Sequence, residues 1–193
     1  EYSIGNLEHV GLKGNFEYVG TFVDTTLVKC SQEHIFAPIS GPVGTRAKLI
    51  KTIIPVLQKL KTKCIISLGT PGKRVSTKTG NCEFHNWLST QERQEAMRDS
   101  KFVIFSGGHA TCFETIKYAK PSICIPTQPE QLGNAAKLKD LNCSITVKNG
   151  KQLEKAIQKM ENEKETYDNN MQALNAFSNK FKGLDRAVSI VET

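Results

Sequence analysis

The chain has 193 residues, of which 38% are hydrophobic and 23% charged, and its formal net charge is +7. This composition is too apolar for a disordered chain and too polar for a membrane protein, so it indicates an ordinary globular protein. The positive charge is local, because nine basic and no acidic residues lie between His34 and Cys82. Such a local excess predicts an anionic partner, which leaves phosphate, nucleic acid and acidic lipid as candidates.

The six cysteines argue against a metal site. They include no CxxC pair, and no histidine lies at metal-ligand spacing, so the common zinc patterns are excluded and we expect no metal. Cys64, Cys82, Cys124 and Cys143 fall in or beside apolar runs, where a free thiol behaves as a small buried hydrophobe. We therefore expect a reducing, cytoplasmic environment. No run of about 18 apolar residues is present, so we expect no membrane span.

Short apolar runs alternate with helical patterns along the chain. After a lead-in over residues 1–33, which we interpret as an interdomain linker, six runs predict strands at 34–39, 64–68, 82–85, 102–105, 122–125 and 143–147. Strands that alternate with helices predict an α/β fold with a parallel sheet. We expect one doubly wound, Rossmann-like domain over residues 34–193, with six parallel strands in the order 3-2-1-4-5-6 and helices on both faces.

Helix signals lie between these strands. Apolar residues repeat at helical spacing over 49–60, although Pro55 should kink or break that helix. Ser89 with Glu92 predicts a capping box that opens a helix to residue 100, and Thr111 with Glu114 predicts a second capping box. A further helix is expected to start at Asn149, and about the last 40 residues have a helical, highly charged pattern.

Two glycine-bearing turns follow the first and fourth predicted strands, at 40–45 and 106–111. In the expected strand order these two strands are neighbours, so both turns would lie at the sheet edge where open α/β sheets bind ligands. Each turn also opens a helix, and a helix N-terminus with small residues exposes N–H groups that bind phosphate. The two turns therefore predict a ligand that carries phosphate.

Neither turn matches the common nucleotide-binding fingerprints. Both lack GxGxxG, and no acidic residue follows the second strand to bind a dinucleotide ribose, so nicotinamide and flavin cofactors are not expected. The GxxxxGK[ST] pattern is absent as well, which excludes an ATPase of the P-loop type.

Residues 87–131 do match a different pattern. A segment that starts at Trp87 precedes the capped helix, Ser106-Gly107-Gly108-His109-Ala110-Thr111 precedes Glu114, and Glu130-Gln131 follows the next strand. This arrangement resembles the donor-nucleotide signature of GT-B glycosyltransferases, the class of the UDP-glycosyltransferases and the bacterial lipid-linked N-acetylglucosaminyl transferase. Residues 16–22 look like the segment by which the chain of such enzymes enters the C-terminal half, so the resemblance extends from about residue 16 onward.

The resemblance implies a role for each matching position. The donor diphosphate would be bound by the second turn (Gly107, Gly108, His109, Ala110 and Thr111), with the first turn (Gly41, Gly44 and Thr45) beside it. Glu114 would bind the ribose, Asn86 and Trp87 would lie at the nucleobase, and Glu130 with Gln131 would contact the sugar. Two positions depart from the pattern: Trp87 is one residue off the plant-type spacing and lacks the following Pro-Gln, and Ser106 replaces the usual histidine.

Each of these residues also has a structural interpretation. Glu114 could serve only as the capping-box partner of Thr111, and His109 could be a solvated residue at the helix entry. Trp87 could be a core or lid residue, because large aromatic side chains contribute strongly to burial. Gln131 could simply begin the next helix.

The resemblance implies the donor half of an inverting glycosyltransferase that uses a nucleotide-diphosphate sugar, most simply a UDP-sugar. Helix N-termini, not a metal or another cofactor, would stabilise the leaving diphosphate. No catalytic residue is expected in this chain, because in the family the general base and the acceptor site belong to an N-terminal domain or a separate subunit. With a lipid acceptor, the protein would associate with the cytoplasmic face of a membrane.

Two alternatives remain open from the sequence. One is a non-enzymatic module that binds nucleic acid or an acidic surface through residues 34–82. That window, however, lacks interleaved aromatics and a dense basic run. The other is a nucleotide-sugar epimerase of the same fold, which would need catalytic acids near the turns. Glu114 and Glu130 are the candidates there.

Overall fold

The structure is a computed structural model that describes residues 19–20, 31–72 and 74–192. The predicted linker over 1–33 and the family-like segment at 16–22 therefore lie almost entirely outside the described residues, as does Cys30.

Strands and helices alternate along the described chain, as the sequence predicts. In chain order they are β1 (His34–Pro38), α1 (Val43–Leu57), β2 (Cys64–Ser67), β3 (Ser76–Thr79), β4 (Cys82–His85), α2 (Thr90–Arg98), β5 (Ser100–Phe105), α3 (His109–Lys117), β6 (Ser122–Cys124), α4 (Pro129–Asp140), β7 (Ser144–Thr146), α5 (Gly150–Asn162), α6 (Lys164–Ser178) and α7 (Gly183–Val191).

The strands form one sheet in the order β3-β4-β2-β1-β5-β6-β7. The six predicted strands are all present, pair in parallel and occupy the predicted order, with β1 and β5 as central neighbours. The prediction of a purely parallel, six-stranded sheet is wrong in one respect. A seventh strand, β3, pairs antiparallel with β4 at the sheet edge and makes the sheet mixed.

The strand β3 has no apolar pattern in the sequence, and this has a physical reason. Its residues are Ser76-Thr77-Lys78-Thr79, and all four are exposed. A strand that packs no side chain against a core has no need of apolar alternation, so it is stabilised through its backbone pairing with β4 across a tight connection at Gly80, whose φ is +58°.

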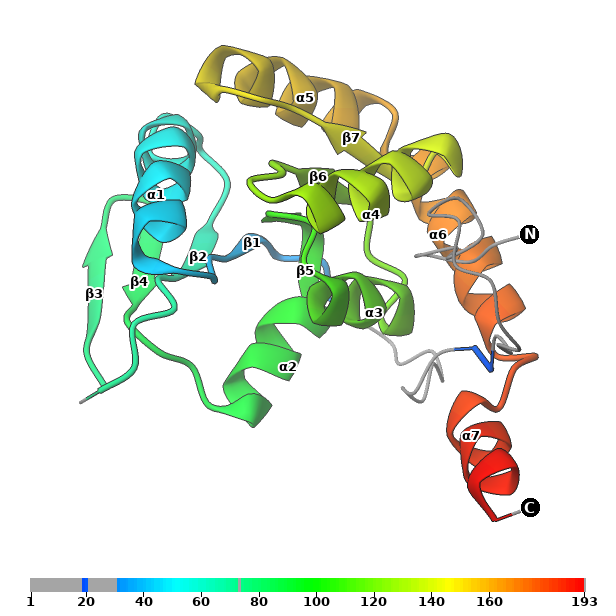
Figure 1. Cartoon of the computed structure of the whole chain (residues 1–193). Helices are drawn as coiled ribbons and strands as arrows, with labels where there is room; N and C mark the ends of the chain where they lie inside the picture. The colour runs from blue at the N-terminus through cyan, green and yellow to red at the C-terminus, as the bar shows by residue number, and fades with distance from the viewer. Residues whose placement is uncertain (1–18, 21–30, 73, 193) are drawn as a thin grey trace.

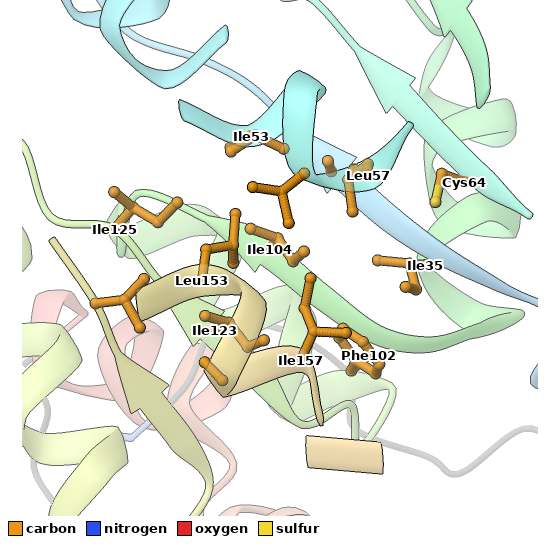
Figure 2. Packing of buried hydrophobic residues seen from close by; sticks show 14 of the residues in the cluster. Ile35, Ile53, Leu57, Cys64, Phe102, Ile104, Ile123, Ile125, Leu153 and Ile157 are labelled. Atoms are coloured by element: carbon orange, nitrogen blue, oxygen red, sulfur yellow. The ribbon is translucent and has the colours of Figure 1, made fainter. Parts of the chain in front are cut away.

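Helices cover both faces of the sheet, as the doubly wound prediction requires. Helices α1 and α5 lie together on one face, and α2 and α3 lie on the other (Figure 1). Successive residues of the central strands alternate between the two cores: Ile104 packs with α1 and α5, whereas Val103 and Phe105 pack with α2 and α3. Figure 2 shows the first core, to which Ile53 of α1, Ile104 of β5 and Ile157 of α5 contribute side chains.

The helix boundaries follow most, but not all, of the sequence signals. The capping box of Ser89 and Glu92 opens α2 as predicted, and the Asn149 side chain caps α5. The helix α2 ends at Arg98 rather than at residue 100, because Ser100 already begins β5. Pro55 lies within α1, which continues for two further residues to Leu57.

The second predicted capping box, of Thr111 with Glu114, is wrong. Helix α3 begins at His109, three residues earlier than an N-cap at Thr111 would place its start, with Gly108 as its N-cap and no side-chain cap. Thr111 therefore lies inside the first turn of the helix. Glu114 is bound by a different residue, as described below.

The described cysteines are buried free thiols, as predicted for four of them. Burial raises the pKa of Cys64, Cys124 and Cys143 to about 12, so these thiols stay protonated and act as small apolar side chains. No helix in the described part of the chain has both the length and the apolarity needed to cross a bilayer.

Candidate functional site

The two glycine-bearing turns lie next to each other at the carboxyl edge of the sheet. Strands β1 and β5 are parallel neighbours, with Ile35 opposite Phe102 and Phe36 opposite Val103. The turn after β1 leads to α1 on one face, and the turn after β5 leads to α3 on the other (Figure 1). This is the topological switch point of the sheet, where open α/β folds bind their ligands.

The backbone of the β5 turn requires glycine at position 107. Gly107 has φ = +87°, and an added Cβ would lie 3.0 Å from the carbonyl oxygen of Gln131. The Gly107 carbonyl accepts a 2.9 Å hydrogen bond from Nδ2 of Asn134, which is buried in α4. The turn is therefore held closely against α4.

The first turn of α3 presents backbone N–H groups without helical acceptors. Its first helical hydrogen bond runs from the Cys112 N–H to the Gly108 carbonyl, at 3.0 Å. The N–H groups of His109, Ala110 and Thr111 precede that bond and have no acceptor within the helix. His109 and Ala110 are exposed, and the His109 ring contacts Phe113 edge-on, with 4.6 Å between ring centroids.

The first turn of α1 also presents backbone N–H groups without helical acceptors. Its first helical bond joins the Arg46 N–H to the Pro42 carbonyl, at 2.9 Å, which leaves Val43, Gly44 and Thr45 without helical acceptors. Gly44 is exposed, and nothing lies within 4 Å of the place where its Cβ would be. The Arg46 guanidinium donates to the Gly69 carbonyl, so it links α1 to the loop after β2.

These two N-termini differ from those of the other helices in the described chain. The helices α2 and α5 are capped by Ser89 and Asn149. The helices α4, α6 and α7 carry an acidic residue in the first turn. Of the described helices, α1 and α3 alone have neither a side-chain cap nor a first-turn acid. The partial positive charge of both helix dipoles is thus left uncompensated at the same edge of the sheet.

Glu114, the predicted ribose ligand, forms an ion pair with Arg93 of α2. Arg93 Nε donates to Glu114 Oε1 at 3.1 Å, and Arg93 Nη2 donates to Oε2 and to the Thr111 hydroxyl. About a quarter of each of the two charged side chains remains exposed. Arg93 was not predicted from the sequence, because a single arginine among the charged residues of α2 has no local signal that points to a residue 21 positions away.

The predicted nucleobase residues lie in the loop between β4 and α2. Trp87 is 46% exposed, so it is not a core residue, and its ring is accessible to a ligand. Asn86 is held in place, since its Oδ1 accepts from the Val75 N–H at 2.7 Å and its own N–H donates to the Val75 carbonyl at 3.1 Å.

The predicted sugar residues differ in their surroundings. Glu130 is exposed in the first turn of α4. Gln131 is buried, and its Oε1 accepts from the backbone N–H and the hydroxyl of Thr127, at 2.9 and 2.8 Å. The Gln131 side chain therefore stabilises the loop that precedes α4, whereas the Glu130 carboxylate faces solvent.

Metal ligands do not converge anywhere in the part of the chain that the structure describes. No group of three or more histidine, cysteine, aspartate or glutamate side chains is placed to hold an ion there.

Comparison with known proteins identifies the fold and the family. The model of the glycosyltransferase family 28 C-terminal domain matches residues 44–187, which are most of the chain and include the N-terminus of α3 and α1 from its second residue onward. No curated protein sequence matches the chain.

Solved structures of glycosyltransferases share the fold. The glycotransferase of kitacinnamycin superposes with a TM-score of 0.67 at 16% identity, over 93% of this chain and 46% of that one. The spinosyn rhamnosyltransferase complexed with thymidine diphosphate gives 0.68 at 15% identity, over 85% and 46%. The calicheamicin glycosyltransferase gives 0.66 at 11% identity, over 95% and 48%. The chain thus spans slightly less than half the length of these enzymes.

Proposed function

We propose, because the chain belongs to the C-terminal domains of glycosyltransferase family 28, that it binds the nucleotide-diphosphate sugar of a glycosyl transfer reaction. The donor we propose is a UDP-sugar, and the domain is the region over residues 34–193. The observation that carries this proposal is the pair of adjacent N-termini of α1 and α3, which lack both a side-chain cap and an acidic residue.

The diphosphate occupies the space between these two N-termini. On one side it accepts from the N–H groups of the Gly107–Thr111 turn, and on the other it lies beside Gly41, Gly44 and Thr45. In an inverting transfer the diphosphate leaves with increasing negative charge, and preorganised N–H donors and helix dipoles stabilise that charge. The local basic excess over residues 34–82 favours the same anion.

With the diphosphate at the two helix N-termini, the ribose, the nucleobase and the sugar of the donor each lie beside one of the other predicted residues. Glu114 accepts the ribose hydroxyls, the exposed Trp87 ring with Asn86 lies at the nucleobase, and Glu130 with Gln131 lies at the sugar. For Gln131 the contact is made through its backbone or through a rearranged side chain, because its carboxamide oxygen is bound by Thr127.

The acceptor and the general base belong to another part of the enzyme. We assign them to an N-terminal domain or a separate chain, since the structurally similar enzymes are about twice as long. On this proposal the chain alone binds donor but transfers sugar slowly or not at all. A lipid acceptor would bring the protein to the cytoplasmic face of a membrane.

Isothermal titration calorimetry with UDP, ADP, TDP and inorganic pyrophosphate tests the donor assignment. We expect binding of the nucleoside diphosphates, with UDP preferred, and weaker binding of pyrophosphate. Equal affinity for all four anions would contradict a nucleotide site and would leave only a phosphate site. Binding of RNA with a steep salt dependence, in the absence of any nucleotide binding, would favour the basic-surface alternative.

A further inference from the structure

We propose that Arg93 is a positioning residue: it orients the Glu114 carboxylate so that the carboxylate binds both ribose hydroxyls, and the site thereby selects ribonucleoside over 2′-deoxyribonucleoside diphosphates. This inference rests on the proposed donor site, and it adds Arg93 to that site and a preference for ribonucleotides.

The ion pair between Arg93 and Glu114 fixes the orientation of the carboxylate. Arg93 Nε binds one oxygen of the Glu114 carboxylate and Arg93 Nη2 binds the other, so the planar guanidinium meets the carboxylate in a two-pronged contact. Such a contact fixes the plane of the carboxylate as well as its position. A lysine could supply the same charge, but not the same orientation.

A third hydrogen bond anchors the guanidinium to α3. Arg93 Nη2 also donates to the hydroxyl of Thr111, at 3.1 Å, and Thr111 is buried. Thr111 and Glu114 are three residues apart, so they lie on the same face of the helix. The guanidinium therefore spans two positions of α3 and cannot rotate without breaking at least one of these contacts.

The ion pair leaves part of the Glu114 carboxylate free to accept hydrogen bonds from a ligand. A carboxylate offers about four acceptor sites, two on each oxygen. Arg93 occupies one site on each oxygen, which leaves one on each oxygen for a ligand. Two free acceptor sites on neighbouring oxygens match the two hydroxyl donors of a vicinal diol, as on carbons 2 and 3 of ribose. The side chain of Glu114 is 26% exposed, so these sites can be reached.

A deoxyribose leaves one of these sites empty. The loss removes a hydrogen bond to a charged acceptor, which corresponds to about a 10-fold weaker affinity or more. Without Arg93 the carboxylate can turn and bind a single hydroxyl with one oxygen, so the 2′-hydroxyl would matter less.

The experiment measures the ratio of the dissociation constants for UDP and 2′-deoxy-UDP by calorimetry. We expect the wild-type chain to prefer UDP by about 10-fold or more, and Arg93→Met to reduce the preference to about 2-fold or less. Arg93→Lys keeps the positive charge, and the fold should tolerate it more easily than Arg93→Met. This variant should also lose most of the preference for UDP over 2′-deoxy-UDP. In a Glu114→Gln background, Arg93→Met should cause little further change in the ratio.

Arg98→Met is the matched control. Arg98 lies on the same helix and makes the same kind of contact, with Nε 3.0 Å and Nη2 2.6 Å from the two oxygens of Asp99, but at the opposite end of α2 from Ser89. It should keep the wild-type ratio.

Equal weakening of UDP and 2′-deoxy-UDP by the Arg93 variants would overturn the inference, because a merely structural role would lower both affinities together. A wild-type ratio in Arg93→Lys and Arg93→Met would overturn it as well. If the wild-type chain binds neither nucleotide, the proposed donor site itself fails. That result is distinct from a bound UDP whose affinity is insensitive to Arg93.

Discussion

Among the helices that start at the carboxyl edge of the sheet, two pairs differ clearly at their N-termini. In the flanking helices α2 and α5, a side chain from the helix's own N-terminus caps the free N–H groups: Ser89 for α2 and Asn149 for α5. In the central helices α1 and α3, no side chain does so, and no acidic residue balances the dipole. The flanking helices therefore have a side-chain partner of their own for these N–H groups, whereas the central helices leave theirs to water or to the ligand we propose.

At the N-terminus of α2, Ser89 and Glu92 satisfy each other's backbone N–H groups. The Glu92 N–H donates to the Ser89 hydroxyl at 3.2 Å, and the Glu92 carboxylate accepts from the Ser89 N–H at 2.7 Å. A phosphate would find both an occupied donor and a negative charge at this place. Adding a carboxylate to the N-terminus of α1 or α3, or removing the cap of α2, therefore separates effects on fold stability from effects on ligand binding.

The largest effect is expected from Gly108→Asp, which gives α3 a capping residue of the flanking kind. Gly108 has φ = −63° and ψ = 141°, which any residue adopts, and its Cβ would lie 3.9 Å from the nearest side-chain atom. The carboxylate should occupy the free N–H groups and repel phosphate, so UDP affinity should fall about 100-fold. The free energy of unfolding should rise by a few tenths of a kcal/mol to about 1 kcal/mol.

Calorimetry and thermal denaturation on the same samples measure both effects of this variant. Gly108→Ala is the control, because it adds a Cβ with neither a cap nor a charge, and it should weaken UDP much less. Unchanged UDP affinity in Gly108→Asp would show that the ligand does not use the α3 N-terminus.

The next effect tests α1. Gly44→Asp places a carboxylate in the first turn of α1, at a position with open space around the new Cβ. We expect UDP affinity to fall about 10-fold, less than for Gly108→Asp, because α1 supplies the second side of the phosphate site. Gly44→Ala serves as the uncharged control in the same titration. If Gly44→Asp binds UDP as well as Gly44→Ala does, the β1 turn lies outside the site.

A smaller effect, on stability alone, is expected from Ser89→Ala. This change removes the cap of α2, so the free energy of unfolding should fall by about 1 kcal/mol. UDP affinity should change by less than about 2-fold, because no ligand contact is assigned to the capped N–H groups. Urea denaturation and calorimetry measure the two quantities. A large loss of UDP affinity would mean that α2, too, contributes its N-terminus to the site.

The smallest effect concerns the acid dependence of the same cap. The hydroxyl of Ser89, and then its backbone N–H, lower the pKa of Glu92 below the ordinary 4.5. A lowered carboxyl pKa in the folded state contributes stability above about pH 4.5, and this contribution is lost as the pH falls through the folded pKa. The stability of Ser89→Ala should thus fall less steeply than that of the wild type below pH 4.5. Parallel pH curves would contradict this assignment.

The sequence by itself determined the features that depend on neighbouring residues. Alternating apolar runs and helix signals predict the six parallel strands, and the capping residues at Ser89 and Asn149 mark two helix starts. The strand order was expected from the doubly wound fold class that this alternation indicates. The adjacent glycine turns follow from that order. These features were predictable because short-range backbone conformation and side-chain periodicity are encoded within a few residues.

Only the tertiary structure decided the features that depend on residues far apart in the chain. The polar strand β3 exists because β4 pairs with it, and Gly107 must be glycine because α4 packs against it. The local residues predict a capping box at Thr111, whereas α3 begins at His109 with Gly108 as its N-cap. Glu114 is bound by Arg93 only because α2 and α3 pack on the same face of the sheet. Such contacts require the whole fold, since no local pattern encodes the distance between two helices.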